Sequence, residues 1–364
     1  MRSMLSKPRF FAAVASAALL ATACGGGGSL DVESNPSQAL SDAAESLANS
    51  DALEAVIRLD ADADDLAALA AEGGDELPAD VAEVITNSSL RVRSQGSGDD
   101  GQFEMAVIID GNESIEIRGI GQEVYIRADV RGLLDRFDTT GTAAAELETG
   151  LEQMQASGLD FVGAAVEGEW IHLTGVQQIM EMMQGFAGGQ PDEAEVEQVT
   201  EQVKQRLQQF FSDEVEVSYI GSEDAGERVR ATATGEELLA LGEELFALIG
   251  PLAAGFAGGQ DPSAAIDELR AEAGADAENF TLPIDVWIDG DRISRVGFDV
   301  IAFAELNAEM LGEDAEVPEG LDRLALVIDL NEFGDSIEAP DDAVEVNLFE
   351  LFGQFGAGLD GLSG

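Results

Sequence analysis

The chain has 364 residues, of which 73 are acidic and 18 are basic, and its net charge at pH 7 is −55. A charge of this sign and size repels phosphate groups, which excludes nucleic acid and anionic membrane surfaces as partners. Hydrophobic residues make up 45% of the chain, which excludes an intrinsically disordered acidic protein. We therefore expect a folded protein whose solvated acidic surface suits a saline medium, as in halophilic proteins, or an alkaline one.

The N-terminus has the layout of a bacterial secretory signal. Three basic residues flank or precede an apolar run at residues 10–20, which is too short to span a bilayer. Residues 20–24 read LATAC and resemble the lipobox, whose cysteine is acylated and begins the mature chain. We predict that residues 1–23 are a lipoprotein signal peptide and that acylated Cys24, which carries palmitate-type chains, anchors the protein to the extracytoplasmic face of the cell membrane. The alternative is an ordinary signal peptide with a chance cysteine.

The remaining chain divides by composition into a tether, a domain and a tail. Residues 24–37 are glycine-rich and polar, which is typical of a flexible tether. Residues 38–347 are predicted to form the folded domain, with helical insertions at about 139–212 and 235–280. Residues 348–364 form a glycine-rich C-terminal tail.

Acidic residues near position 60 resemble the start of a calcium loop but do not complete it. Asp60, Asp62 and Asp64 alternate as in such a loop. Asp65 stands where the loop needs a glycine, and Ala71 stands where it needs a bidentate glutamate. We expect an acidic strand end and loop here, and we predict no metal site and no cofactor.

Alternating apolar residues predict antiparallel strands joined by tight turns. Apolar side chains alternate along residues 103–109, and the turn sequence at 110–112 is DGN, a hairpin signal. The alternation continues at Ile115 and Ile117. Alternation along the whole sequence predicts about eleven to thirteen strands, most of them with one apolar face.

Three segments are predicted to run directly from a strand into a helix. They pair residues 124–129 with 130–137, 170–173 with 176–186, and 229–233 with 236–249. Asp129, Thr174 and Thr234 are the predicted N-caps, because their side-chain oxygens can accept the first free amides of a helix.

The single histidine, His172, lies in one of these predicted strands. A lone histidine in an alternating strand is more often a surface or wall residue than a catalytic base. The chain has no second histidine and no free thiol after acylation, so we predict no catalytic residue and no enzymatic activity. Acidic residues are so numerous that paired carboxylates carry no information.

Two of the predicted helices present wide apolar surfaces. Residues 176–186 include Met180 and Met183, and residues 236–249 are rich in leucine. Core packing explains such surfaces by itself, although methionine also suits a wall that must adapt to a flexible apolar ligand. The hexapeptide GFAGGQ occurs at 185–190 and again at 255–260, which indicates either an internal duplication or convergence on a loop sequence.

Three further strands are predicted near the C-terminus, at residues 282–288, 296–302 and 324–330. The first two flank the turn sequence DGD at 289–291. Each of the three strands alternates apolar and polar side chains, so each presents one apolar face.

These last strands resemble a known family. Residues 283–289 (PIDVWID), 295–298 (RVGF) and 329–340 (DLNEFGDSIEAP) are similar to the closing strands of the mycobacterial LppX/LprG-type lipoproteins. Residues 124–126 (VYI) and 169–170 (EW) correspond to that family's earlier strand and tryptophan segment. The resemblance covers the lipobox and residues 88–138 and 281–346; between about 139 and 280 extra acidic helices lengthen this chain.

The resemblance implies an α+β fold, a curved antiparallel half-barrel akin to the Lol lipoprotein carrier, with helices across its concave face. It also implies a cavity that holds the acyl chains of a lipid or lipoglycan. We predict that the following residues line this cavity: Leu282, Ile284, Val286, Ile288, Val296, Phe298, Val300, Leu326, Ile328, Met180 and Met183. The expected function is binding or transfer of lipid or another apolar ligand at the cell envelope, and the alternative is a ligand-free structural or interaction lipoprotein. Oligomeric state is not indicated by the sequence.

Overall fold

The structure of the protein is a computed structural model. It describes residues 31–48, 50–73, 77–96, 101–137, 142–156, 159, 161–176, 198–199, 202–203, 205–206, 209–253, 281–306, 321, 323–349 and 351. Three of the predicted site residues, Cys24, Met180 and Met183, lie outside these ranges, as do both copies of the GFAGGQ hexapeptide.

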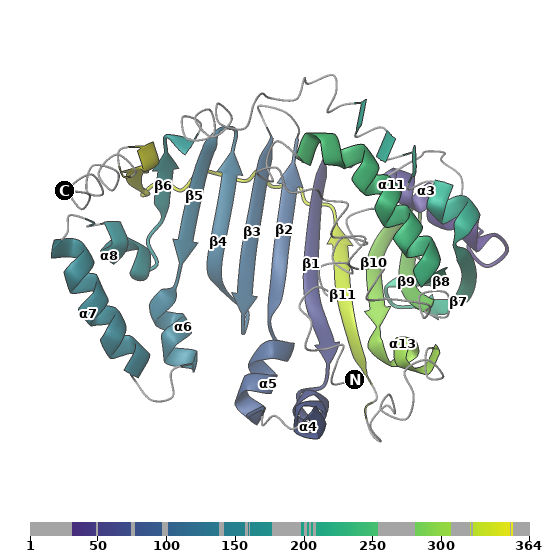
Figure 1. The fold of residues 1–364 in the computed structure, drawn as a ribbon, viewed down its shortest axis with the longest axis horizontal. Helices are drawn as coiled ribbons and strands as arrows, with labels where there is room; N and C mark the ends of the chain where they lie inside the picture. The colour runs from purple at the N-terminus through teal and green to yellow at the C-terminus, as the bar shows by residue number, and fades with distance from the viewer. Residues whose placement is uncertain are drawn as a thin grey trace, which may run out of the picture. The chain divides into compact units, whose positions relative to one another are not determined.

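The described chain forms one open sheet of twelve strands together with helices, which confirms the predicted α+β class (Figure 1). The strands are β1 (Ala52–Ala61), β2 (Ser89–Gln95), β3 (Gln102–Ile109), β4 (Asn112–Ile120), β5 (Glu123–Ala128), β6 (Ile171–Thr174), β7 (Glu216–Glu223), β8 (Gly226–Thr234), β9 (Thr281–Asp289), β10 (Arg292–Asp299), β11 (Leu324–Asn331) and β12 (Val344–Asn347). Their order is β12-β6-β5-β4-β3-β2-β1-β11-β10-β9-β8-β7. Within the series β2 to β6, each strand pairs antiparallel with the next strand in sequence, and the same holds within the series β7 to β11. Strand β12 pairs with β6 in parallel.

Helices follow or precede several of these strands. They are α3 (Pro36–Ala48), α4 (Ala63–Gly73), α5 (Ala79–Thr86), α6 (Val130–Phe137), α7 (Thr142–Ala156), α8 (Phe161–Val166), the π-helix η2 (Phe210–Glu214), α11 (Gly235–Ala253) and α13 (Val300–Leu306).

The described chain divides into two compact units, each built from three stretches of sequence. Unit 1 comprises the described residues within Met1–Ser50, Ile57–Ala82 and Ala187–Asn331. Unit 2 comprises those within Asp51–Val56, Glu83–Phe186 and Glu332–Gly364. The chain thus visits each unit more than once, and its last segment belongs to unit 2.

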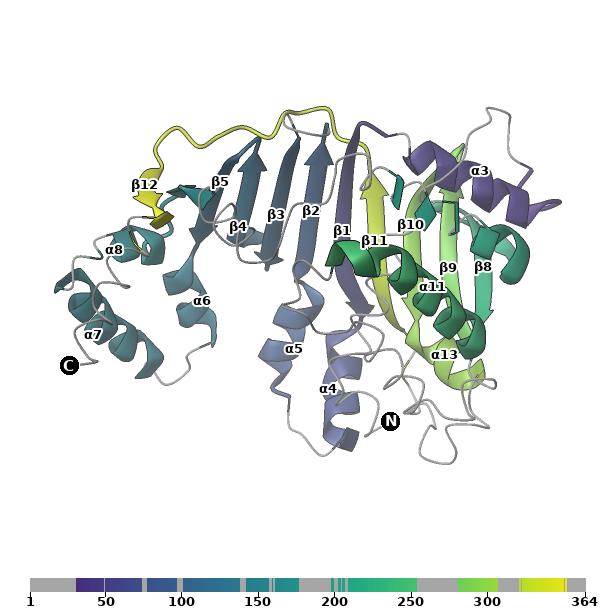
Figure 2. The same cartoon turned by 45° about the horizontal axis from the view of Figure 1, so that its top comes forward.

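Unit 1 has a helix-covered sheet. Helix α3 packs against β7, β9 and β10, and α13 packs against β9 and β11 (Figures 1 and 2). Leu282 of β9 and Phe298 of β10 are buried in a cluster with Phe303 of α13, and Leu238 of α11 packs against it. The apolar face of the unit 1 strands is therefore where its core lies.

The DGN turn and two of the three predicted caps are present in the described structure, and the helix predicted to follow the third, Thr174, lies beyond the described residues except at 176. Asp110 and Gly111 have φ angles of 49° and 73°, the backbone that a two-residue type I′ hairpin needs. Asp129 Oδ1 accepts the Gly132 amide at 2.9 Å at the start of α6. Thr234 and Glu237 form a reciprocal capping box at the start of α11, with N to O distances of 2.7 and 3.3 Å.

One strand ends earlier than its apolar alternation predicts. Residues 296–302 were expected to continue as a strand, but β10 ends at Asp299 and α13 begins at Val300. The Asp299 carboxylate accepts the amides of Ile301 and Ala302, each at 3.0 Å. This side-chain cap favours a helix over further strand at Val300.

The described chain begins within the segment expected to form the tether. Asp31 opens a turn in which its side chain accepts the Ser34 amide at 3.2 Å, and α3 begins at Pro36. Val32 is buried. Residues 31–37 therefore belong to the fold of unit 1.

Candidate functional site

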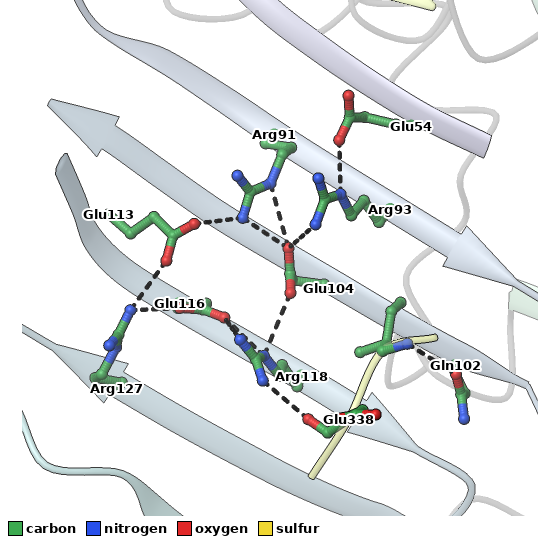
Figure 3. A network of polar contacts seen from close by, with 11 residues as sticks. Glu54, Arg91, Arg93, Gln102, Glu104, Glu113, Glu116, Arg118, Arg127 and Glu338 are labelled. Atoms are coloured by element: carbon green, nitrogen blue, oxygen red, sulfur yellow. Dashed lines mark hydrogen bonds and ion pairs between the residues drawn. The ribbon is translucent and has the colours of Figure 1, made fainter. Parts of the chain in front are cut away.

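One face of the unit 2 sheet carries a network of alternating arginines and glutamates (Figure 3). Glu104 Oε1 accepts from Arg91 Nη2 at 2.8 Å, and its carboxylate lies 3.3 to 3.5 Å from Arg118 and Arg93. Glu116 pairs with Arg118 at 2.5 Å. The full set is Glu54, Arg91, Arg93, Glu104, Glu113, Glu116, Arg118 and Arg127. The four positive and four negative charges of this network balance one another.

Burial and neighbouring charges set the protonation of two carboxyls in this network. Burial raises the pKa of Glu116, whose exposed fraction is 0%, and the charges of Arg118 and Arg127 offset only part of that rise. Burial alone would also raise the pKa of Glu113, but the hydrogen bond and charge of Arg91 lower it below its ordinary value. Arg127 Nη2 contacts both carboxylates, at 3.1 and 2.6 Å, so the two groups titrate as a pair.

The indole of Trp170 lies against the same network. The guanidinium carbons of Arg118 and Arg127 stand 4.7 and 5.0 Å from its ring centroid. Contacts of this kind stabilise a desolvated guanidinium by about 1 kcal/mol each. Trp170 therefore helps to fix two arginines whose other contacts are the buried Glu116 and its neighbours.

A segment that we call the strap, residues 332–343, crosses this charged face between β11 and β12. The Glu338 carbonyl accepts a hydrogen bond from Arg118 Nη1 at 2.9 Å, and the Ile337 amide donates to Gln102 Oε1 at 3.3 Å. The Phe333 ring lies 5.4 Å from the guanidinium carbon of Arg93. Ile337 is 5% exposed. The strap thus covers part of the charged face. We therefore assign the charged face a role in holding the fold together.

The single histidine lies at the edge of the network. His172 of β6 stacks on Tyr125 of β5 with ring centroids 4.5 Å apart, and its Nε2 lies 4.0 Å from Glu123 Oε2. The Tyr125 hydroxyl donates to the same oxygen at 2.7 Å. Within the described residues no group of three or more histidine, cysteine, aspartate or glutamate side chains is placed to hold a metal ion.

Both tyrosines of the chain are held against carboxylates, and we expect neither to ionise at its ordinary pH. Burial and the hydrogen bond to Glu123 raise the pKa of Tyr125 to about 12, and the 2.6 Å hydrogen bond to Glu227 raises the pKa of Tyr219 to about 12. A folded-state pKa above the unfolded value of about 10 favours folding below pH 10. That contribution disappears as the pH rises through the folded-state value.

The measurement is the absorbance of tyrosinate at 295 nm, which reports two groups only, because the chain has two tyrosines. The native protein should titrate near pH 12 and the urea-unfolded protein near 10. Glu227→Gln serves as the control that moves Tyr219 alone toward 10. Ionisation of one tyrosine near pH 10 in the native protein would contradict the assignment.

Unit 1 contains a second network of the same kind on the polar face of its sheet. Asp285 of β9 is 2% exposed and accepts three hydrogen bonds, one from Arg228 Nη2 at 2.5 Å and two from Arg230 at 2.7 and 2.8 Å. The Trp287 indole donates to Glu223 Oε2 at 2.8 Å, which lowers the pKa of that carboxyl. Each unit therefore pairs a buried acid with two arginines and places a tryptophan beside them.

The nine described residues of the predicted cavity wall all belong to unit 1 and lie on the opposite face of the same strands. Leu282, Val286, Ile288, Val296, Phe298 and Ile328 are buried, whereas Ile284, Val300 and Leu326 are half-buried. The three half-buried residues border the cluster of Leu282, Phe298 and Phe303 beneath α11 and α13. The structure brings these nine residues together between sheet and helices; their contact with a ligand stays a prediction.

In unit 2 the apolar face of the sheet is exposed at β3, whereas Ile171 of β6 on the same face is buried and α8 contacts β5 and β6. Phe103 is 45% exposed and Met105 is 36% exposed, and both lie on β3, a central strand of this unit. Among the described elements only β2 and β4 make extensive contact with β3. Strand register places these residues on the same face: Leu90, Val92, Phe103, Met105, Val107, Ile115, Ile117, Val124, Ile126, Ile171 and Leu173. We call this surface the open face; across five strands it is about 19 Å wide.

Exposed apolar side chains are unevenly shared between the units. Of the seven large hydrophobic residues that are exposed in the described chain, six belong to unit 2 and one, Ile220, belongs to unit 1. The six are Ile85, Phe103, Met105, Phe137, Met154 and Phe349. The open face carries no charged side chain, although one residue in four of the whole chain is charged. It is therefore the surface that suits an uncharged apolar ligand.

The chain is similar to the crystal structure of the Mycobacterium tuberculosis lipoprotein LppX. The identity is 10%, the TM-score is 0.30, and the likeness covers 84% of this chain and 97% of that chain. A lipoprotein of the family indicated by the sequence is thus among the structures that this chain resembles, and the likeness carries no inference about a ligand. No protein-family model and no curated protein matches the chain. None of the helices that the structure describes is long and apolar enough to cross a membrane.

Proposed function

We propose that the protein is an extracytoplasmic lipoprotein, held at the cell membrane by acylated Cys24, that binds or transfers lipid or another apolar ligand. The observation that carries the proposal is the open face of unit 2. Phe103 and Met105 stand exposed at the centre of a sheet face whose side chains are uncharged. Covering such a surface is favourable by about 25 cal/mol for each Å² of apolar area removed from water.

The sequence supports the location in this proposal. Residues 1–23 have the order of a signal peptide, and Cys24 follows the lipobox-like residues 20–23. The acidic surface suits an envelope bathed in a saline medium, because salt screens repulsion between exposed like charges. We assign the chain no catalytic step, since its single histidine is stacked on Tyr125 and its paired carboxylates are held by arginines.

A second function, that of a ligand-free interaction lipoprotein, is favoured by one observation in unit 1. Six of the nine described residues of the predicted cavity wall are buried, and Leu282 and Phe298 pack against helix side chains. If the open face of unit 2 takes no lipid, this second function is the better account.

We expect lipid to co-purify with the protein and to depend on the open face. The non-acylated Cys24→Ala chain, purified from its host without detergent, would be examined by native mass spectrometry and organic extraction. Met105→Glu places a charge in the open face, where desolvating a carboxylate is costly, and should reduce bound lipid about tenfold or more. Ile220→Glu alters an apolar residue of unit 1 that is 46% exposed, more than Met105, and should retain the lipid.

The two outcomes separate the proposals. Lipid that is present in the parent and in Ile220→Glu but absent from Met105→Glu supports binding at the open face. A parent chain that carries no lipid, and that takes none up from vesicles of the host's own lipids, would rule out lipid binding and favour the interaction lipoprotein.

A further inference from the structure

Phe103 and Gly119 are packed against each other on the open face of unit 2. They stand directly opposite in the register of β3 and β4. A Cβ atom placed on Gly119 would lie 1.9 Å from Cε1 of the Phe103 ring, and 2.5 and 2.8 Å from Cδ1 and Cζ. The edge of the ring therefore occupies the space that any larger residue at position 119 would fill.

The backbone at Gly119 does not by itself require glycine. Its φ is outside the left-handed region, unlike that of Gly111 in the preceding turn, so other residues could adopt the conformation. A glycine inside a strand also weakens the strand, because it has no side chain to pack. The ring of Phe103 is thus the feature of the structure that accounts for glycine at this position.

The ring is nevertheless far from buried. Phe103 remains 45% exposed after it has packed against Gly119, and Met105, two residues further along β3, is 36% exposed. On the two neighbouring strands, Ser94 of β2 lies opposite Phe103 and Val124 of β5 lies opposite Gly119, and both residues are uncharged. An aromatic side chain of this size loses most of its contact with water only when something else covers it.

We propose that Phe103 and Gly119 together form the contact point for the apolar chain of the ligand, with the ring as the contacting group and the glycine as the residue that keeps the ring low on the sheet. This inference rests on the proposed function and names the residues that set the affinity. With glycine at 119 the ring lies over β4, and a ligand chain can cross β3 and β4 above it. With any larger residue the ring must rise into the space where the ligand chain lies.

The test uses the non-acylated Cys24→Ala full-length chain and an uncharged apolar dye, N-phenyl-1-naphthylamine, whose fluorescence rises on transfer from water. Phe103→Ala should weaken dye binding about tenfold, because the contacting ring is removed. Gly119→Ala should weaken it several-fold by lifting the ring. In the Phe103→Ala background, Gly119→Ala should have almost no further effect, since the ring with which its Cβ collides is absent.

Two controls test whether the loss of dye binding is specific to the open face and whether each variant is folded. Ile220→Ala removes an apolar side chain that is 46% exposed in unit 1 and should leave dye affinity unchanged. Thermal melting followed by circular dichroism checks that each variant is folded, and Phe103→Leu, which keeps apolar bulk, replaces Phe103→Ala if the latter unfolds.

Each outcome bears on a different claim. If the parent chain binds no dye and no host lipid, the proposed function fails. If the parent binds the dye but Phe103→Ala, or Phe103→Leu in its place, binds it within twofold of the parent, the open face still binds and the contact point is wrong. If the effects of Phe103→Ala and Gly119→Ala simply add, the glycine acts independently of the ring and the pairing is wrong.

Discussion

Asp285→Ala should destabilise unit 1 by about 3 kcal/mol. Asp285 is 2% exposed and accepts all three of its hydrogen bonds from Arg228 and Arg230. Removal of the carboxylate leaves two guanidinium groups on the sheet without this partner. The side chains of Arg228 and Arg230 retain 20 and 23% exposure, so water can solvate them in part, which places the cost at the lower end of the range for broken buried pairs.

The tryptophan beside this cluster supplies the measurement. Trp287 lies 5.0 Å from the guanidinium carbon of Arg228, and the chain has one other tryptophan, Trp170 in unit 2. In a Trp170→Phe background, urea unfolding followed by fluorescence reports Trp287 alone. Asp285→Asn keeps the shape and loses the charge, so its destabilisation should fall between that of Asp285→Ala and the parent.

The matched control is Asp291→Ala, which removes an exposed aspartate from the hairpin that joins β9 to β10. An exposed substitution of this kind changes stability by about 0.5 kcal/mol or less. An unfolding midpoint for Asp285→Ala that matches the midpoint of Asp291→Ala would show that the three hydrogen bonds contribute nothing net to unit 1.

The strands of this fold are predictable from the sequence because their signals are local. The DGN and DGD turns set hairpins whose flanking residues alternate, and the structure has β3–β4 and β9–β10 at those places. The step from β8 to α11 is likewise encoded within four residues, since Thr234 and Glu237 cap each other. Local chemistry also explains why β10 is shorter than the strand predicted at residues 296–302. Apolar alternation alone predicts that the strand continues, but Asp299 caps a helix at that point.

The candidate site is less predictable because it depends on what covers each face. Phe103 and Met105 alternate in the same way as Leu282 and Ile284, yet the first pair is exposed and the second pair lies beneath helices. Alternation shows that a strand has an apolar face, but the sequence does not show which helix returns to cover it. The exposure of the open face is therefore a property of tertiary packing that residue pattern alone leaves undetermined.

The charged networks show a related limit. Composition indicates an acidic surface, and the structure adds that arginines gather opposite carboxylates on the polar faces of the strands. A signal for this exists in the sequence, because Arg91 and Arg93, and Arg228 and Arg230, are two residues apart and so share a strand face. The partners of these arginines come from other strands, so their pairing follows from register.

Cys24→Ala should move the protein from the membrane to the soluble fraction almost completely. Acyl chains anchor a protein through burial of their methylene groups, at about 0.8 kcal/mol each, so that two chains together anchor it stably. The net charge of the mature chain offers no electrostatic substitute for this anchor. Removal of residues 1–23 takes away Arg2, Lys7 and Arg9, which leaves 15 basic and 73 acidic residues, a net charge of −58 that anionic lipid repels.

The same substitution should leave the fold intact, because the described fold begins at Asp31, seven residues beyond Cys24. Detergent-phase partitioning and incorporation of labelled palmitate would be measured for the parent, for Cys24→Ala and for Ser29→Ala, a small tether residue that is not acylated. The parent and Ser29→Ala should enter the detergent phase and carry label, whereas Cys24→Ala should do neither and should melt at the parent's temperature. A parent chain that is already soluble would favour the ordinary signal peptide with a chance cysteine. A Cys24→Ala chain that stays with membranes after a high-salt wash would show that some other part of the protein binds them.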